Sequence, residues 1–201
     1  MRRIAGLVLL SWAVMANAAE PRRQIGHVEG QPVYADQIAG DSRQARADSA
    51  SKVFMAPMLG QWMREHSAVS RPTEAEKQGA EKAIAAYAAC SGNGYALPEA
   101  SGQRDAVLRM LIGNAKLQKY LYDAYGGGRL LFQQAGVEAF DATRRMLEAQ
   151  EAEGRFAITD PQVRALAYDY WTRDHGAFMI TDPAKIAEAL DVTSSIARCP
   201  A

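Results

Sequence analysis

The sequence has little of the material from which catalytic and metal sites are usually built. Its 201 residues include three histidines and two cysteines, and no histidine has a second His or Cys three or four residues on to form a metal-binding helix face. Neither a Gly-x-Ser-x-Gly elbow nor a recognisable Cys–His pair is present. Residues 126 to 128 are three glycines, but no Gly-Lys-Ser/Thr follows them, so they do not form a phosphate-binding loop. We therefore expect no enzymatic activity, no metal site and no cofactor.

A charge excess of either sign is also missing, because 23 basic side chains are balanced by 23 acidic ones. Such a balance lacks the electrostatic footprint that binds nucleic acid or an anionic membrane. At 48% apolar residues, the chain can still bury a sizeable core. We therefore exclude nucleic acid as a partner and do not expect recognition by strong electrostatics.

Residues 1 to 20 have the organisation of a secretory signal peptide. Two arginines give a basic start, residues 4 to 15 are an apolar run, and residues 16 to 18, Ala-Asn-Ala, fit the small-x-small cleavage rule. The apolar run is about a dozen residues long, which is short of the ~20 that span a bilayer. We therefore expect cleavage after Ala18, a periplasmic mature protein and no stable membrane anchor after cleavage.

The rest of the chain is predicted to be a single helical domain, residues 25 to 201, preceded by a flexible lead over residues 19 to 24. Two short extended pieces meet around Gly30, and helical patterns with capping signals follow. The predicted fold class is therefore mainly α, a multi-helix domain with a short N-terminal β-hairpin-like segment. Its first half covers residues 25 to 90 and its C-terminal helical half covers residues 103 to 201.

A helix rich in methionine and aromatic residues follows the hairpin, and a charged helix follows it. Pro57 lies in the apolar helix and either begins it as part of its first turn or kinks it. Thr73 and Glu76 have the spacing of a capping box and mark the start of the second helix.

Apolar and aromatic side chains of two helical patterns are the candidates for binding polypeptide, because methionine-rich surfaces suit promiscuous binding. The alternative is that they are core residues, and we favour the core for most of them. The candidates are Phe54, Met58, Trp62, Tyr120, Tyr122 and Tyr125.

Polar side chains gather after the triple glycine and form a second candidate cluster. Its members are Arg129, Gln133, Gln134 and Asp141. If they are buried, they form a satisfied structural network, and if they are exposed, they form a ligand site. We favour the structural interpretation, and the ligand site stays an alternative.

The two cysteines suit an exported protein better than a cytosolic one. Cys90 ends a helical pattern and Cys199 lies near the C-terminus. A Cys90–Cys199 bridge would close a loop of about 110 residues and hold the C-terminal tail. A redox pair is the alternative, but there is no C-x-x-C and the flanks are not electropositive. We therefore predict a structural disulfide.

The chain begins with a hairpin and a capped helix, and the apolar helix and the charged helix follow. This order resembles the N-terminal domain of the SurA-type periplasmic chaperones and their peptidyl-prolyl isomerase relatives. The resemblance covers residues 25 to 90. The matching residues are Val28, Gly30, Val33, residues 58 to 66 and residues 73 to 76. Residues 125 to 171 contain the motifs Gly-Gly-Arg and Phe-Gln-Gln. This segment is similar to the C-terminal half of uncharacterised exported proteins built on that domain.

The resemblance implies a chaperone-like protein that binds unfolded or extended polypeptide between its helices, and a homodimer stays open. It does not imply isomerase activity, because the strand-rich parvulin domain that often follows has no counterpart in this sequence. The alternative function is a periplasmic immunity- or inhibitor-type protein that binds one specific partner. An enzyme with an unrecognised site is the third possibility.

Overall fold

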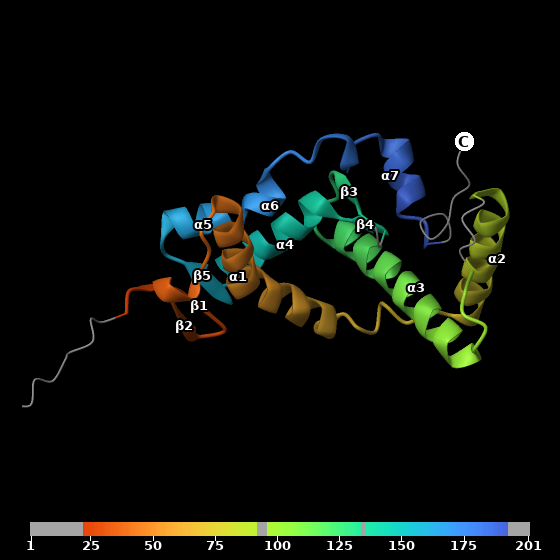
Figure 1. The fold of residues 1–201 in the computed structure, drawn as a ribbon, viewed down its shortest axis with the longest axis horizontal. Helices are drawn as coiled ribbons and strands as arrows, with labels where there is room; N and C mark the ends of the chain where they lie inside the picture. The colour runs from red at the N-terminus through yellow and green to blue at the C-terminus, as the bar shows by residue number, and fades with distance from the viewer. Residues whose placement is uncertain (1–21, 92–95, 134–135, 193–201) are drawn as a thin grey trace, which may run out of the picture.

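The computed structural model describes residues 22–91, 96–133 and 136–192. The signal peptide predicted over residues 1 to 18 lies outside these ranges. The described residues form seven α-helices, two 3₁₀ helices and two three-stranded antiparallel sheets, which confirms a mainly α fold with an N-terminal hairpin. Figure 1 shows these elements spread along one long axis, with the hairpin towards one end and α2 (Glu74–Ser91) at the other. Within these ranges, no helix combines the length and the apolar character needed to cross a membrane.

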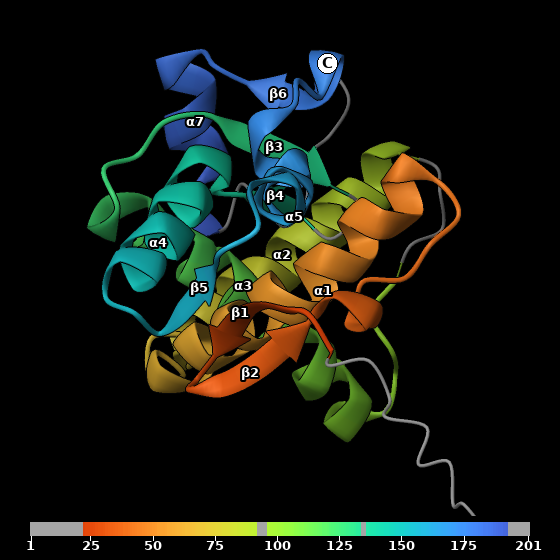
Figure 2. The ribbon, with the colours of Figure 1, turned by 90° about the vertical axis from the view of Figure 1, so that its left-hand side faces the viewer.

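The predicted hairpin is present and is extended by a third strand. β1 (Gln24–Val28) pairs with β2 (Gln31–Tyr34) through a two-residue turn, and both turn residues, Glu29 and Gly30, have positive φ angles of 48° and 74°. Such turns suit the right-handed twist of antiparallel strands. β5 (Phe156–Ile158) pairs with the other side of β1, as Figure 2 shows, so the C-terminal half of the chain completes the N-terminal sheet.

The flexible lead predicted over residues 19 to 24 overlaps the first strand. Gln24 already belongs to β1. Arg22 forms an ion pair with Asp36 at 2.8 Å, and Arg23 forms one with Asp160 at 2.7 Å. The described end of this segment is therefore held against the folded domain by side chains that are distant in sequence.

Helix α1 (Arg43–Glu65) is longer than the apolar pattern alone predicted. The Ser42 hydroxyl caps its first turn by accepting the Ala45 N–H at 3.1 Å, so the polar stretch before the apolar pattern is helical. Pro57 lies inside this helix and not at its start. Figure 1 shows that α1 changes direction along its length, as expected of a helix that contains a proline.

The main core lies between the first sheet and helices α1, α4 (Phe140–Ala152) and α5 (Pro161–Ala167). The buried side chains that α1 contributes to it are Ala47, Ala50, Phe54, Met55, Met58 and Trp62. A row of apolar side chains along one helix face is what a core-facing helix requires.

The predicted capping box starts α2 (Glu74–Ser91). The Thr73 N–H donates to Glu76 Oε2 at 2.6 Å, and the Glu76 N–H donates to Thr73 Oγ1 at 3.2 Å. α2 packs on α3 (Ser101–Ala124), and the two helices share a second, smaller core. The buried residues of this second core are Ala80, Ile84, Leu108 and Ile112.

The second sheet has the strand order β4-β3-β6, from β3 (Leu130–Gln133), β4 (Gly136–Glu138) and β6 (Met179–Ile180). Residues 136 to 138 lie in the half predicted to be helical but form β4, so α4 begins only at Phe140.

Short elements complete the chain. Three of them are η1 (Ala35–Gln37), α6 (Asp169–Thr172) and η2 (Gly176–Phe178). The fourth is α7 (Pro183–Ala189), which begins with a proline behind an aspartate cap, as α5 does.

Candidate functional site

The apolar binding candidates on α1 lie in the core. Phe54 and Met58 are completely buried, and Trp62 is 4% exposed. The Trp62 ring stacks on His66 with 4.4 Å between ring centroids, and its indole Nε1 has no hydrogen-bond partner among the described residues. These three side chains therefore offer no open surface to a polypeptide.

The three tyrosine candidates at the end of α3 point to different places. Tyr120 and Tyr125 lie around Trp62, with ring centroids 6.0 Å and 6.4 Å from it. Tyr122 instead lies beneath the triple glycine, in the wall of a separate cavity. The tyrosines therefore do not form one binding edge.

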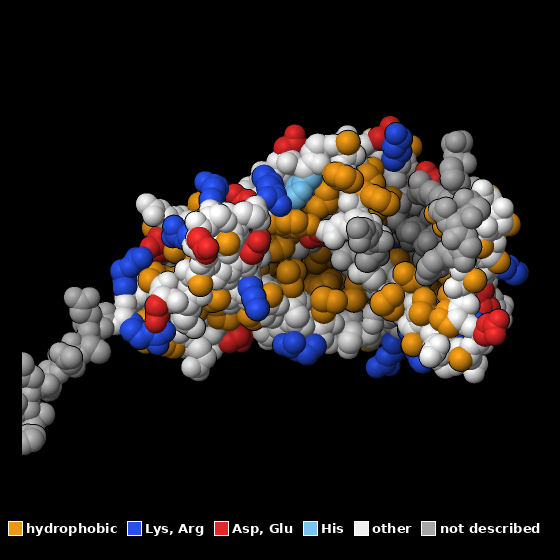
Figure 3. Space-filling view, in the orientation of Figure 1, with side chains coloured by type: hydrophobic (Ala, Val, Ile, Leu, Met, Phe, Trp, Pro, Cys, Tyr) orange, Lys and Arg blue, Asp and Glu red, His pale blue; other side chains and the backbone are white. Residues whose placement is uncertain are grey.

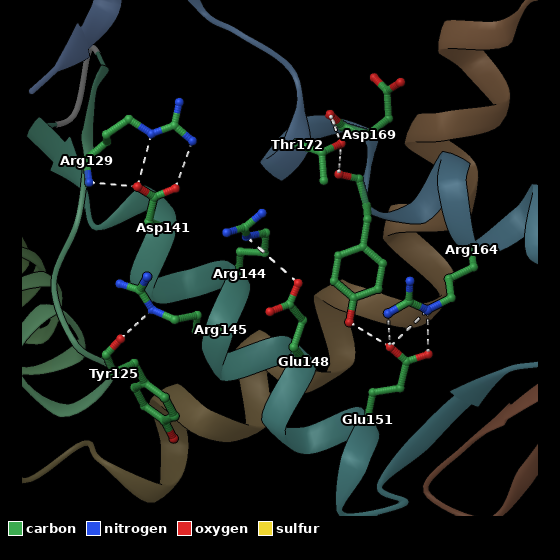
Figure 4. Close-up of polar contacts among 11 residues, drawn as sticks. Tyr125, Arg129, Asp141, Arg144, Arg145, Glu148, Glu151, Arg164, Asp169 and Thr172 are labelled. Atoms are coloured by element: carbon green, nitrogen blue, oxygen red, sulfur yellow. Dashed lines mark hydrogen bonds and ion pairs between the residues drawn. The ribbon is translucent and has the colours of Figure 1, made fainter.

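Two members of the predicted polar cluster, Arg129 and Asp141, form a close pair (Figure 4). Asp141 Oδ2 accepts the Arg129 backbone N–H at 2.8 Å and Nε at 3.0 Å, while Oδ1 accepts Nη2 at 2.9 Å. Burial alone would raise the pKa of the Asp141 carboxyl, but the hydrogen bonds from the Arg129 side chain and backbone outweigh it and hold this pKa below its usual value. The carboxylate is therefore ionised at neutral pH, with both of its oxygens engaged.

This pair holds the turn from which β3 begins. Residues 126 to 128 have φ angles of 77°, 68° and 106°, which favour glycine. A Cβ on Gly128 would lie 2.6 Å from the Asp141 Cβ. Arg145 of α4 also donates to the Tyr125 carbonyl at 2.7 Å (Figure 4) and to the Gly127 carbonyl. The interactions of Arg129 and Asp141 thus fix the direction in which β3 leaves the turn.

The other two members of the cluster are not part of this pair. Gln134 lies outside the described residues. Gln133 belongs to a second set of contacts centred on Glu138 of β4. Its Nε2 donates to Glu138 Oε2 at 2.5 Å and to the Tyr170 hydroxyl at 2.6 Å. The predicted cluster therefore divides into two separate groups.

We call Glu138, Gln133, Tyr170 and Trp171 the Glu138 network. The Tyr170 hydroxyl donates to Glu138 Oε2 at 2.7 Å, and Trp171 Nε1 donates to Glu138 Oε1 at 3.2 Å. Burial, with a smaller contribution from the hydrogen bond to Glu138 and its negative charge, raises the pKa of Tyr170 above its ordinary value. Tyr170 therefore stays protonated, and the network ties the β3–β4 hairpin to α6.

Two exposed phenylalanines, absent from the sequence-based candidates, lie beside this network. Leu130 pairs with Ile180 and Leu131 with Met179, so Phe132 and Phe178 each lie one residue beyond the last paired position, on segments that contact each other. Their exposures are 57% and 63%, although β3 and η2 are in contact. The hydrophobic periodicity of the sequence could not have identified these two residues. They lie in a four-residue strand and a three-residue 3₁₀ turn, which are too short to show a period.

The turn that carries Phe178 is held from behind by an aromatic cluster. The Phe178 N–H donates to the His175 carbonyl at 3.4 Å, and His175 Nε2 lies 2.9 Å from the Tyr170 carbonyl. The His175 ring meets Phe140 and Tyr170 edge-on, with centroids 5.3 Å and 5.0 Å away. The Phe132–Phe178 pair therefore stands on a supported part of the fold.

Hydrophobic side chains also line a hollow in one face of the molecule (Figure 3). Comparison with Figure 1 places this hollow around β3 and β4, between α1 and α3. The second sheet thus adjoins this apolar hollow, and we take it as the candidate binding surface.

A separate cavity of about 760 Å³ lies between the end of α3, the start of β3, the first turn of α4 and α7. Tyr122, Arg129 and Asp141 line it together with apolar side chains of α7. Its two cations are engaged by carboxylates, Arg129 by Asp141 and Lys119 by Asp123 at 2.7 Å. Neither cation is therefore left to recruit an anionic ligand.

Two further expectations bear on the chemistry of the site. Cys90 lies near the end of α2, but Cys199 lies outside the described residues, so the predicted disulfide stays a prediction. Among the described side chains, no three His, Cys, Asp or Glu residues are grouped so that they could hold a metal ion.

Comparisons of the chain with protein-family models, with curated proteins and with solved structures find no match.

Proposed function

We propose that this protein is an exported, chaperone-like protein that binds unfolded or extended polypeptide and has no isomerase activity. The observation that carries the proposal is the exposure of two phenylalanines on segments in contact, Phe132 on β3 and Phe178 at the end of η2. Burying a phenylalanine side chain is worth roughly 1.5–3 kcal/mol. A partner that covers both rings therefore gains much of its affinity from these two residues.

We expect a polypeptide to bind this surface through its side chains and not by adding a strand to one of the two sheets. β6 is only two residues long, and the outer strand of the first sheet, β2, contains Pro32, which has no N–H to donate. Each feature hinders one edge of its sheet, β6 in the second sheet and β2 in the first, from pairing with another chain. The apolar rings, by contrast, are open to solvent and can accept side chains of many sequences.

The sequence supports the periplasm as the place where this binding occurs. Residues 1 to 20 have the pattern of a cleavable export signal, and the N-terminal half resembles the SurA-type domain. Unfolded outer-membrane proteins are the clients that such a location and such a resemblance imply.

The proposal is tested by the aggregation of an unfolded client. The chain from residue 19 is mixed with an outer-membrane β-barrel protein diluted from urea, and light scattering is followed. We expect suppression at several-fold molar excess, and we expect the double variant Phe132→Ser/Phe178→Ser to lose most of it. Met110→Ser is the matched control, because Met110 is 63% exposed but lies on α3, beside the second core.

Two results would overturn the proposal. The first is that the wild-type protein fails to suppress aggregation at excess. The second is that Met110→Ser is as harmful as the double variant, since general surface hydrophobicity would then explain the effect. Binding to one folded partner at fixed stoichiometry, without binding to unfolded clients, would instead identify the immunity- or inhibitor-type protein.

A further inference from the structure

We propose that helix α7 occupies a groove that can instead take an amphipathic helix of a partner polypeptide. The inference goes beyond the proposed function, because it adds a second binding site to the surface that carries Phe132 and Phe178. In the structure a helix of the chain itself lies in the groove, so the second site is autoinhibited.

The contacts of α7 have the pattern of a helix bound in a groove. The buried side chains of the helix and its C-cap are Ile186, Ala189 and Leu190, and all three belong to the main core. Their spacing of i, i+3 and i+4 places them on one helix face. Ala184 and Lys185, on the other face, are exposed. Amphipathic helices bind apolar grooves through the same spacing.

α7 is also a self-contained element near the end of the described chain. Asp182 Oδ1 caps it by accepting the N–H groups of Ala184 at 2.8 Å and Lys185 at 3.2 Å. The helix follows β6, a strand of two residues, and no later strand lies in the described residues. It can therefore leave the groove without disturbing the pairing of either sheet.

The groove is larger than the helix that it holds. The cavity of about 760 Å³ lies between α7 and a wall that includes Tyr122, Gly128 and the Arg129–Asp141 pair. Ala187 lines this cavity and has the smallest side chain among the α7 residues that do so. A helix with a large apolar side chain at this position would fill the space and bury more apolar surface than α7 does.

Apolar contact and shape, not charge, determine which helix fits. The two cations that line the cavity are each paired with a carboxylate. A partner helix therefore needs apolar side chains at the positions of Ile186 and Leu190, together with a large apolar side chain at the position of Ala187.

α7 competes with every such partner, because it is attached to the groove. An attached ligand has an effective concentration in the millimolar range. The apparent affinity of a free helix is reduced by the small fraction of molecules in which α7 has left. Loosening α7 should therefore strengthen partner binding, and tightening α7 should weaken it.

The test measures binding of a fluorescein-labelled peptide to the chain from residue 19 by fluorescence anisotropy. The peptide has the sequence of residues 181–192 with the change Ala187→Leu. The protein variant Ile186→Ser/Leu190→Ser should release α7 and bind this peptide about tenfold or more tightly than the wild type does. A peptide that itself carries Ile186→Ser/Leu190→Ser should not bind.

The opposite change is Ala187→Leu in the protein, and Ala184→Leu is its matched control. Both alanines lie on α7, but only Ala187 lines the cavity. Ala187→Leu should fill the space, hold α7 in place and weaken peptide binding about three- to tenfold. Ala184→Leu should bind the peptide as the wild type does. Circular dichroism of each variant checks that the helical fold is intact.

Three results would overturn the inference. The first is equal peptide affinity of the wild type and Ile186→Ser/Leu190→Ser, and the second is an equal effect of Ala187→Leu and Ala184→Leu. The third is a wild-type dimer that Ile186→Ser/Leu190→Ser cannot form, because the occupant would then be α7 of a second copy. If the double variant does not fold, the two leucine variants decide. The exposed phenylalanines do not line the cavity, so these results leave the proposed function untouched.

Discussion

Gly128 is the position at which a single methyl group should do most damage to the candidate surface. It is the last residue of the triple-glycine turn, has a φ of 106°, and precedes the residue whose side chain anchors β3 to α4. A Cβ at this position would lie 2.6 Å from the Asp141 Cβ and 2.8 Å from its Oδ2. The Asp141 Cβ is attached directly to the backbone of α4, so it cannot swing away as the end of a long side chain could.

The expected cost of Gly128→Ala has two parts. Placing an alanine in left-handed backbone costs about 1–2 kcal/mol. Forcing a methyl group into a filled site costs about 1–3 kcal/mol more. Gly154→Ala is the control, because Gly154 has a φ of 75° and nothing lies within 4 Å of the added Cβ. The control should therefore show only the first part.

Urea unfolding followed by tryptophan fluorescence measures both variants. Gly128→Ala should lower the free energy of unfolding by about 2–5 kcal/mol and Gly154→Ala by about 1–2 kcal/mol. The first variant should also weaken polypeptide binding, because the start of β3 moves. Equal losses in the two variants would refute the claim that α4 holds the turn by close contact.

Two further predictions concern the Asp141 carboxylate and the α1 core. Because the folded pKa of Asp141 is lowered, the stability advantage of the wild type over Asp141→Asn should be complete above about pH 4 and decline as the pH falls through the lower folded value. Urea unfolding at pH 7 and pH 3 measures this, and an advantage that grows on acidification would contradict it. Phe54→Ala should lower the free energy of unfolding by about 3–5 kcal/mol, because the side chain is completely buried. A loss below about 1 kcal/mol would place Phe54 on the surface and restore it as a binding candidate.

Local signals in the sequence predicted the N-terminal hairpin and the first two helices. Thr73 with Glu76, and aspartate–proline pairs before α5 and α7, mark helix starts through side chains that lie next to the turn they cap. The hairpin is predicted from two short extended pieces around Gly30, which has the positive φ that such a turn requires. Such signals depend on residues that are close in sequence, so one sequence is enough to read them.

Contacts between distant segments could not be predicted in the same way. β5 joins β1, and β6 joins β3, through strands of two to five residues that are too short to have a measurable period. The exposure of Phe132 and Phe178 depends on these pairings. Composition alone gives no means of distinguishing an exposed phenylalanine from a buried one such as Phe54.

The structure brings together only two members of the predicted polar cluster. Arg129 and Asp141 do meet, whereas Gln133 is grouped with Glu138. Four residues along a helix return to the same face, but four residues along a strand span about 13 Å. Because β3 is a strand, Gln133 lies too far along it to share the contacts of Arg129.

Site-specific photo-crosslinking tests the central claim most directly. A photoreactive phenylalanine analogue replaces Phe178 in one protein and Met110 in another, and each is irradiated with the same urea-diluted β-barrel client and with the folded form of that client. We expect crosslinks to the unfolded client from position 178, few from position 110, and none from either position to the folded form. Equal crosslinking from the two positions, or none from position 178, would contradict the account.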